Sequence, residues 1–158
     1  SLGLSGSGAF NGSNNQLTSF VGLSNSINLK GGKFFGSLYW GKSNGISNKL
    51  GMIQSLSNLY SSAFGVGFLK SSIFNNLDTF IVTIDQPIRI ESGSLQLNIP
   101  TYRTKEKKVL FHSMNFHLNP SGREVHAKAQ YFSSYRNIGY GLTLGYKSDP
   151  YHIKFMDD

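Results

Sequence analysis

The chain has 158 residues, of which 39% are hydrophobic and 13% aromatic, with 18 glycines and only 15% charged residues. This length suits one domain, and the abundance of glycine and aromatic residues favours a β-rich fold over a helical enzyme. The net charge is +7. Cysteine is absent, which excludes a disulfide framework and a thiolate metal site. No run of 18 or more apolar residues occurs, so the sequence predicts no transmembrane helix but leaves transmembrane strands open.

The chain begins at Ser1 and shows no basic-plus-apolar signal segment, so we expect a fragment of a longer protein. Residues 1–16 are rich in Gly, Ser and Asn, which predicts a loop or a frayed first strand. Alternating apolar residues over 18–29 and 33–42 then predict a hairpin joined by a Gly-Gly turn.

Residues 43–60 are the least regular part, and we expect a long loop there that allows one short helix. Residues 62–70 alternate bulky apolar side chains with Ala and Gly, which predicts another strand.

The clearest pattern covers residues 78–100. The even positions over 80–90 are almost all apolar and the odd ones mostly polar, a period of two that a strand with one apolar face explains. The next strand alternates in the same way after Ser92-Gly93, which suits a tight turn. We therefore predict a hairpin in which Ile90 faces Leu95.

The last third of the chain predicts three more strands. Residues 109–118 and 123–132 flank a four-residue turn, and pairing them as a hairpin places Phe116 opposite Val125. Residues 138–146 alternate large apolar side chains with Gly and Thr and close the readable pattern.

The predicted strands are about 9 to 12 residues long, which exceeds the usual length in soluble proteins and suits strands that cross a membrane. Outer-membrane barrels alternate short turns with long loops along the chain. The short turns predicted at Gly31, Ser92 and Pro120 do not keep this alternation. A further strand within residues 43–60 would restore it. Six aromatic residues fall near strand ends, where an interfacial girdle would place them: Phe80, Tyr102, Tyr131, Phe132, Tyr140 and Tyr146.

Over residues 1–158 we therefore predict an all-β fold. It is an antiparallel up-and-down β-meander of about eight visible strands, and it forms part of an outer-membrane-type β-barrel.

Few residues suggest chemistry. Gly41 to Gly45 matches the G-x-S-x-G pattern that places a nucleophilic serine, here Ser43, on a strand-to-helix elbow. No buried parallel strand or βαβ pattern accompanies it, so a loop is the better interpretation. Four cations cluster around a single acid, Glu106, and a solvated loop explains them better than a phosphate or lipopolysaccharide contact: Arg103, Lys105, Lys107 and Lys108.

Two sets of titratable residues share strand faces. His117, His126 and Glu124 form one set, which the polar lining of a wet interior explains better than a metal or acid–base site. The other set is a charge network facing a lumen: Asp85, Arg89 and Glu91. The sequence thus predicts no catalytic, cofactor-binding or metal-ligating residue.

Four pieces of the sequence resemble a known family: residues 61–67, 85–93, 120–124 and 145–152. Pro100 and residues 6–10 and 20–23 are similar as well, so the resemblance covers nearly the whole chain. They are similar to the C-terminal region of autotransporter-like subtilisin-type serine peptidases (subtilases) of Gram-negative bacteria, where such pieces read close to S-Q-P-L-R-V-E-S-G, P-S-G-R-E and D-P-G-H. Tyr151 stands where that family usually has Gly. The resemblance implies an N-terminal peptidase passenger carried by a C-terminal barrel-like region at the outer membrane and cell surface.

None of the three subtilisin triad motifs is present, so we expect this fragment to be non-catalytic. The favoured hypothesis is a β-domain that anchors or helps export the peptidase passenger. Its partners would be outer-membrane lipid and that passenger, without nucleic acid or cofactor. The alternative is a soluble β-sandwich that serves as an accessory or adhesin-like domain of an extracellular protein, with its apolar faces in a packed core.

Overall fold

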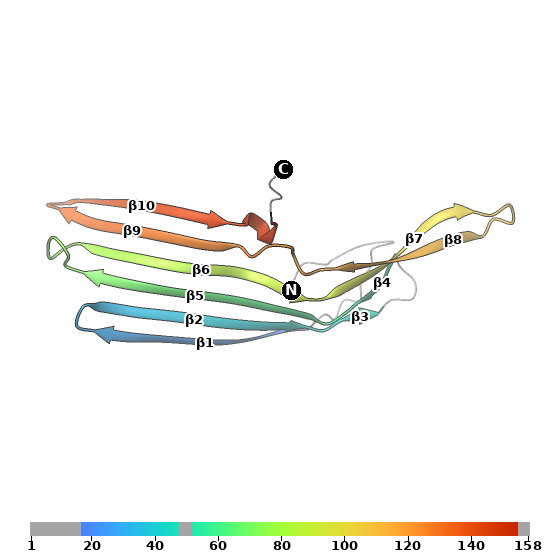
Figure 1. Ribbon diagram of the computed structural model, residues 1–158, viewed down its shortest axis with the longest axis horizontal. Helices are drawn as coiled ribbons and strands as arrows, with labels where there is room; N and C mark the ends of the chain where they lie inside the picture. The colour runs from blue at the N-terminus through green and yellow to red at the C-terminus, as the bar shows by residue number, and fades with distance from the viewer. Residues whose placement is uncertain (1–16, 48–51, 155–158) are drawn as a thin grey trace. The chain divides into compact units, whose positions relative to one another are not determined.

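The computed structural model describes residues 17–47 and 52–154, which form ten β-strands and one short 3-10 turn, η2 (Figure 1). The predicted all-β, antiparallel fold class is confirmed. The predicted loop over residues 1–16 lies outside the described residues. No helix in the described part is long and apolar enough to cross a membrane. The elements are β1 (Thr18–Leu29), β2 (Gly32–Ser43), β3 (Ile46–Ser47), β4 (Ile53–Leu56), β5 (Leu59–Ser71), β6 (Thr79–Ser92), β7 (Ser94–Arg103), β8 (Val109–His117), β9 (Val125–Tyr135), β10 (Ile138–Ser148) and η2 (Pro150–His152).

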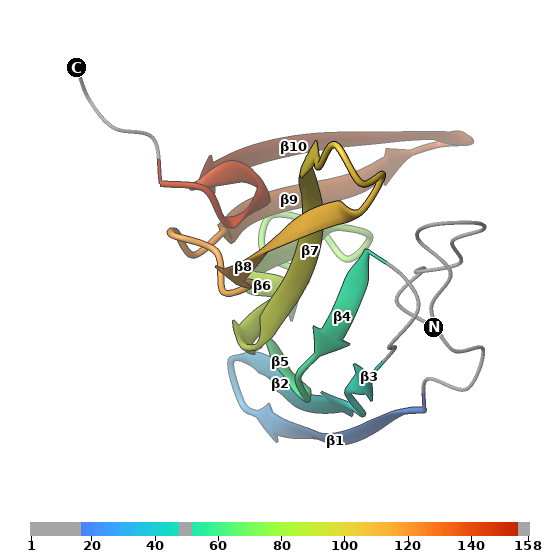
Figure 2. The same cartoon turned by 90° about the vertical axis from the view of Figure 1, so that its right-hand side faces the viewer.

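The strands form two sheets. One has six strands in the order β1-β2-β5-β6-β9-β10, and the other has four in the order β3-β4-β7-β8. The chain also divides into two compact units. The unit made of Val21–Trp40, Ser62–Arg89 and the residues from Pro120 onward holds most of the larger sheet, and we call it the six-stranded unit. The four-stranded unit contains the described residues of Gly41–Ser61 and Ile90–Asn119, and Figure 2 shows its sheet.

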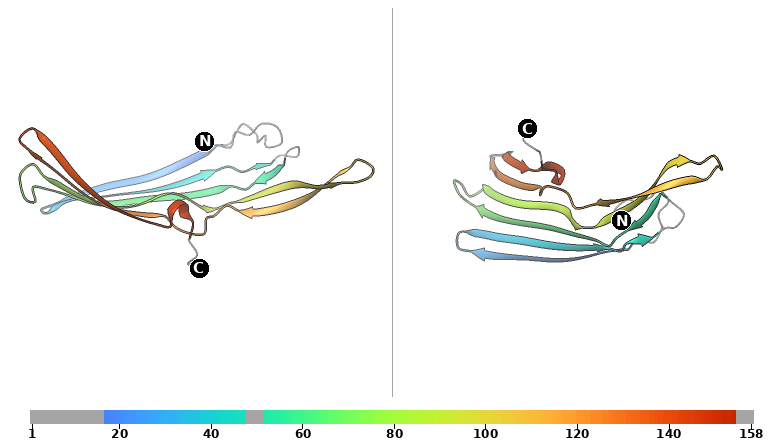
Figure 3. Two further views of the ribbon diagram at one scale, coloured as in Figure 1. Left: turned by 90° about the horizontal axis from the view of Figure 1, so that it is seen from above. Right: turned by 45° about the vertical axis from the view of Figure 1, so that its right-hand side comes forward.

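The six-stranded sheet is built from three hairpins, β1–β2, β5–β6 and β9–β10. Their turns, at residues 30–31, 72–78 and 136–137, lie together at one end of the sheet, which we call the turn end (Figure 1). Two further views show the twist of this sheet from β1 to β10 (Figure 3). Within the described residues the sheet is open, with β1 and β10 as its edges.

The described part of residues 43–60 is not a loop with a helix. It contains the short strands β3 and β4, which pair with each other, with Ile46 opposite Leu56. Of the three short turns predicted at Gly31, Ser92 and Pro120, only the first is a hairpin turn of the six-stranded sheet.

The predicted hairpin over residues 78–100 is wrong. β6 lies between β5 and β9, whereas β7 pairs with β4 and β8, so that Leu95 faces Phe116 and not Ile90. The shift of apolar residues from even to odd positions at Gly93 marks the passage from one sheet to the other. A Cβ at Gly93 would overlap the end of the Leu59 side chain, so a larger residue there would require that side chain to move.

The predicted hairpin between residues 109–118 and 123–132 is also wrong. β8 pairs with β7, and β9 pairs with β6 and β10, so that Val125 faces Ser148 and not Phe116. Residues 118–124 are not a tight turn but a connection from the smaller sheet to the larger one. Strands with the same alternation are interchangeable in a local pattern, which is why this pattern did not identify the partners.

The predicted faces of β6, β9 and β10 are confirmed by the register. Val82 lies opposite Ala129, and Leu144 opposite the same residue from the other side. We call this side the apolar face; over these three strands it carries Phe80, Val82, Ile84, Ala127, Ala129, Tyr131, Tyr140, Leu142, Leu144 and Tyr146. The other side, the polar face, carries Thr83, Asp85, His126, Lys128, Gln130, Thr143, Gly145 and Lys147, together with the apolar Ile81 and Phe132.

Hydrophobic burial is confined to one unit. Among the described residues only Ile53, Leu56 and Leu59 are buried hydrophobic side chains, and all three belong to the four-stranded unit. The six-stranded unit thus has no buried hydrophobic side chain in the part of the chain that the structure describes.

The packing of β10 against β9 yields a first prediction. Gly141 lies opposite Phe132, and a Cβ there would come within 2.8 Å of the phenyl ring, whereas a Cβ at Gly139 meets nothing within 4 Å. We expect Gly141→Val to lower the free energy of unfolding by roughly 1–3 kcal/mol through overpacking. Gly139→Val, on the same strand and face, should be nearly neutral because Val suits a strand. Denaturant unfolding followed by circular dichroism compares the two.

In the Phe132→Ala background, adding Gly141→Val should no longer lower the free energy of unfolding, because the ring that the valine would contact is absent. If the two valine variants were equally stable, the contact between Gly141 and the ring would not constrain β10.

Candidate functional site

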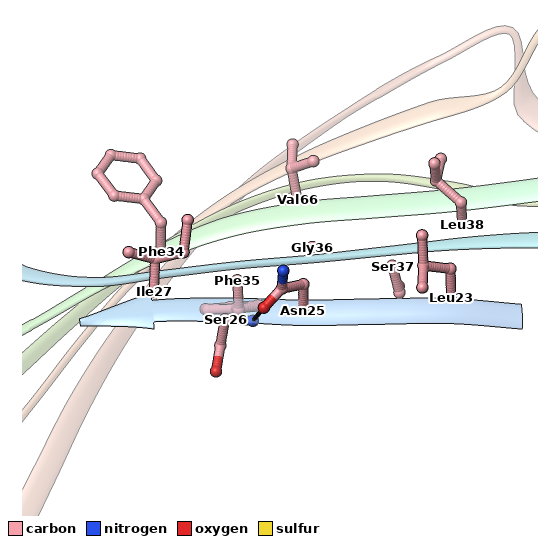
Figure 4. A pocket seen from close by; sticks show the side chains of 10 residues that line it. All are labelled: Leu23, Asn25, Ser26, Ile27, Phe34, Phe35, Gly36, Ser37, Leu38 and Val66. Carbon is pink, nitrogen blue, oxygen red and sulfur yellow. Dashed lines mark hydrogen bonds between the residues drawn. The ribbon is translucent and has the colours of Figure 1, made fainter.

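The apolar face is continuous across the six strands. A hollow of about 330 Å³ joins β1, β2 and β5, and its apolar lining is Leu23, Ile27, Phe34, Leu38 and Val66. Figure 4 shows Leu23, Phe34, Leu38 and Val66 on one side of the ribbon and Ser26 on the other. A second hollow, of about 180 Å³, links Phe34, Val66 and Phe68 to Val82 and Ile84 of β6. The rings of Phe34 and Phe68 lie with their centroids 4.6 Å apart.

A third hollow, of about 330 Å³, extends the same face over β9 and β10, between Val82, Ala127 and Leu144. Leu142 and Leu144 are 60% and 64% exposed in this structure. Lys128 also lines the third hollow but belongs by its register to the polar face, and the residues that the register places on the apolar face are uncharged. An exposed apolar surface that spans six long strands is far larger than the scattered apolar residues of a soluble monomer, which marks this face as a candidate interaction surface.

A polar network closes the end of the six-stranded sheet opposite the turn end. Residues 85–89 of β6, 120–126 at the start of β9 and 149–154 after β10 meet there, and we call this network the clasp.

Glu124 is the centre of the clasp. Its side chain is only 7% exposed and accepts hydrogen bonds from Lys147 Nζ at 2.7 Å, from His126 Nε2 and from the backbone N–H of Tyr151. His126 also reaches Asp85 through Nδ1 at 3.1 Å. The ammonium of Lys147, followed by the imidazole of His126, lowers the pKa of Glu124 to about 2, although burial acts in the opposite direction.

His152 fastens the segment after β10 to the sheet. Its buried ring accepts the backbone N–H of Glu124 at Nδ1 over 2.8 Å, so the proton lies on Nε2, which is 3.2 Å from the carbonyl oxygen of Ile88. The carbonyl of His152 accepts the N–H of Gly122 at 2.7 Å. The ring and the main chain of His152 therefore bind both β6 and the β8–β9 connection.

Two arginines hold the β8–β9 connection from the other side. Arg89 donates to the carbonyl oxygens of Gly122 at 3.0 Å and Pro120 at 2.9 Å. Arg123 donates to the side-chain oxygen of Gln86. Gln86 is 2% exposed, and its side-chain NH₂ donates in turn to Ser62 of β5. The clasp therefore ties three strands and two connections together.

The residues singled out in the sequence occupy different places. Ser43 ends β2, is 2% exposed, and its hydroxyl lies 2.8 Å from that of Thr18; the strand β3 follows it and not a helix. Glu124 and His126 are in contact as their shared face predicted. His117 lies in β8 opposite Ser94, in the other unit, so the predicted set of three is divided.

The predicted charge network is also arranged differently. Asp85 contacts His126 and, at 3.6 Å, Lys128, while Arg89 binds main-chain carbonyls, and Glu91 lies further along β6. Sequence reasoning did not single out Gln86, Lys147 and His152 as site residues. All three lie within pieces that carry the family resemblance, which was the available signal.

Across residues 17–47 and 52–154, no group of three or more His, Asp or Glu side chains is arranged to hold a metal ion. Comparison with known proteins gave no matching family model, no matching curated protein and no matching solved structure.

The carboxylate of Glu124 makes the stability of the clasp depend on pH. Its pKa is about 2 in the folded chain and near 4.5 without the network, so its stabilising effect is complete above pH 5 and is lost as the pH falls towards 2. We expect Glu124→Gln to lower the unfolding midpoint at pH 7, and the difference from the unchanged chain to shrink between pH 5 and pH 2. Thermal unfolding at a series of pH values measures this.

The matched control is Glu106→Gln, in the exposed turn between β7 and β8. It should leave the pH profile unchanged. Parallel profiles for Glu124→Gln and the unchanged chain from pH 5 to 2 would show that Glu124 does not couple protonation to stability.

Proposed function

We propose that the chain is a non-catalytic C-terminal β-domain that forms part of an outer-membrane-type β-barrel. In this proposal it anchors, or helps to export, a subtilisin-like serine peptidase passenger at the surface of a Gram-negative bacterium. The observation that carries the proposal is the uncharged, exposed apolar face of the six-stranded sheet, backed by a polar face on the other side of the same strands.

The dimensions of the strands support a membrane partner. The six strands of the larger sheet have 11 to 14 residues each, and roughly 9–11 tilted residues are enough to cross the hydrocarbon layer. The exposed aromatic residues Tyr140 and Tyr146 lie near the two ends of β10, at the levels where amphipathic rings favour the membrane interface.

The peptidase passenger rests on the resemblance of four sequence pieces. Residues 85–89, 120–124 and 149–152, which lie within three of these pieces, meet in one hydrogen-bonded network, so these resembling positions belong to one site of the fold.

A label test separates lipid from a protein core. The chain has no cysteine, so Leu142→Cys, Leu144→Cys and Thr143→Cys each give a single labelling site. In phospholipid vesicles, fluorophores at Leu142 and Leu144 should be quenched by lipid-bound nitroxides, and one at Thr143, on the polar face, should be reached by a water-soluble quencher. Leu142→Arg should cost roughly 2–4 kcal/mol of stability, and Thr143→Arg much less.

Stability alone does not discriminate, because an unpaired charge in a protein core is also costly. The quenching pattern does. Labels at Leu142 and Leu144 that are shielded from both quenchers would place these residues in a protein core and favour the soluble sandwich.

The proposal also predicts that the chain has no hydrolytic activity. Ser43 is buried and bonded to Thr18, and no subtilisin triad motif is present in the sequence. We expect a fluorophosphonate probe to leave the purified chain unlabelled, and peptide substrates to remain intact. Labelling that disappears in Ser43→Ala would contradict a purely structural role for this domain.

A further inference from the structure

The turn end of the six-stranded sheet carries a cationic hollow. It has a volume of about 470 Å³ and is lined by three exposed lysines, Lys30, Lys33 and Lys70, together with the hydroxyl-bearing Ser71 and Ser72. No acidic residue lines it. In the part of the chain that the structure describes, none of the three lysines has an ion-pair partner.

The acid in the adjacent loop does not neutralise these lysines. Asp78 is 1% exposed, and its oxygens accept the backbone N–H groups of Ile73, Phe74 and Asn75 at 2.7 to 3.1 Å and the hydroxyl of Tyr131 at 3.1 Å. Asp78 is thus hydrogen-bonded to its own loop and to β9, and it makes no ion pair with these lysines in the described residues. Arg136, in the β9–β10 turn, adds a further cation at this end of the sheet.

The β1–β2 hairpin runs directly from these lysines into the apolar hollow of Figure 4. Ile27, three residues before Lys30, and Phe34 both line that hollow of about 330 Å³. Lys33 leaves β2 on the face opposite to Phe34, so it lines the hollow at the hairpin tip and not the apolar one. One hairpin therefore presents positive charge at its tip and an open apolar surface along its length. Lysine stems extend along apolar surface while their ammonium groups reach the level of lipid headgroups.

We propose that this hairpin binds an anionic phospholipid, with the headgroup phosphate at Lys30, Lys33 and Lys70 and an acyl chain along Leu23, Phe34 and Leu38. The proposal rests on the membrane placement proposed above and adds a lipid class and a side of the sheet. Free phosphate would use only the cationic hollow and would leave the apolar one exposed. An acidic polymer such as a nucleic acid would likewise have no use for the apolar hollow.

The test uses the purified chain in non-ionic detergent with one fluorophore. Gly31 is suited to it, since a Cβ there meets no atom within 4 Å, and Gly31→Cys is the single cysteine. The probes are dioctanoyl phosphatidylglycerol, dioctanoyl phosphatidylcholine and inorganic phosphate. We expect saturation at the lowest concentration with phosphatidylglycerol, weaker binding of phosphatidylcholine, and no response to phosphate at the same concentrations.

Replacing the three lysines together, Lys30→Gln, Lys33→Gln and Lys70→Gln, should weaken phosphatidylglycerol binding on the order of 100-fold, about fivefold per cation. The triple Lys→Arg variant at the same positions should retain binding. A charge-matched control removes three cations from the turn between β7 and β8 and should leave the response unchanged: Lys105→Gln, Lys107→Gln and Lys108→Gln.

Three outcomes would overturn the proposal. The first is that the triple Lys→Gln variant at positions 30, 33 and 70 binds phosphatidylglycerol as tightly as the unchanged chain. The second is that the control variant at positions 105, 107 and 108 loses as much phosphatidylglycerol affinity. The third is that inorganic phosphate binds as tightly as the lipid. If the chain showed no preference for phosphatidylglycerol over phosphatidylcholine but the label at Leu142 were quenched as expected, only the proposed lipid site would be rejected. Failure of that quenching would remove the membrane function itself.

Discussion

Side chains on antiparallel strands alternate between two faces, and in the six-stranded sheet this alternation separates an uncharged surface from a hydrogen-bonding one. Val82, Ala129 and Leu144 lie in register across three strands, and Thr83, Lys128 and Gly145 lie in register on the opposite face. Burial of apolar area is the main favourable term in folding, and here that area is still exposed in the described chain. The apolar face therefore contributes little burial energy within the described residues.

The clasp solves a different problem, which is how strands without a hydrophobic core are held in register at one end. It uses buried polar groups, and every one of them has partners: Gln86 binds Ser62 and Arg123, and Glu124 binds three donors. Tyr151 and His152 adopt left-handed φ values of 61° and 59° in this segment. Glycine would adopt that conformation without steric strain, so the tyrosine at position 151 carries a backbone cost that glycine would not.

Local patterns predicted the strands and their faces, and with them the contact between Glu124 and His126. They did not predict which strands pair. At Gly93 the apolar residues change from even to odd positions. A tight turn and a passage between two sheets both produce this change, so the pattern does not distinguish them. The contacts of His152 were equally hidden, because they depend on a left-handed backbone and on main-chain groups of Ile88 and Gly122, none of which has a signature in side-chain alternation.

The sequence separation of the clasp has a consequence for the order of folding. The ring of His152 bonds to a residue 64 positions earlier, and Arg89 to a connection 31 to 33 positions later. Contacts that close such long loops form late, since the chain entropy that they remove must first be offset by nearer pairings. We therefore expect the hairpins β5–β6 and β9–β10 to form before residues 149–154 dock, so that docking of this segment would report a correctly assembled β6, β9 and β10.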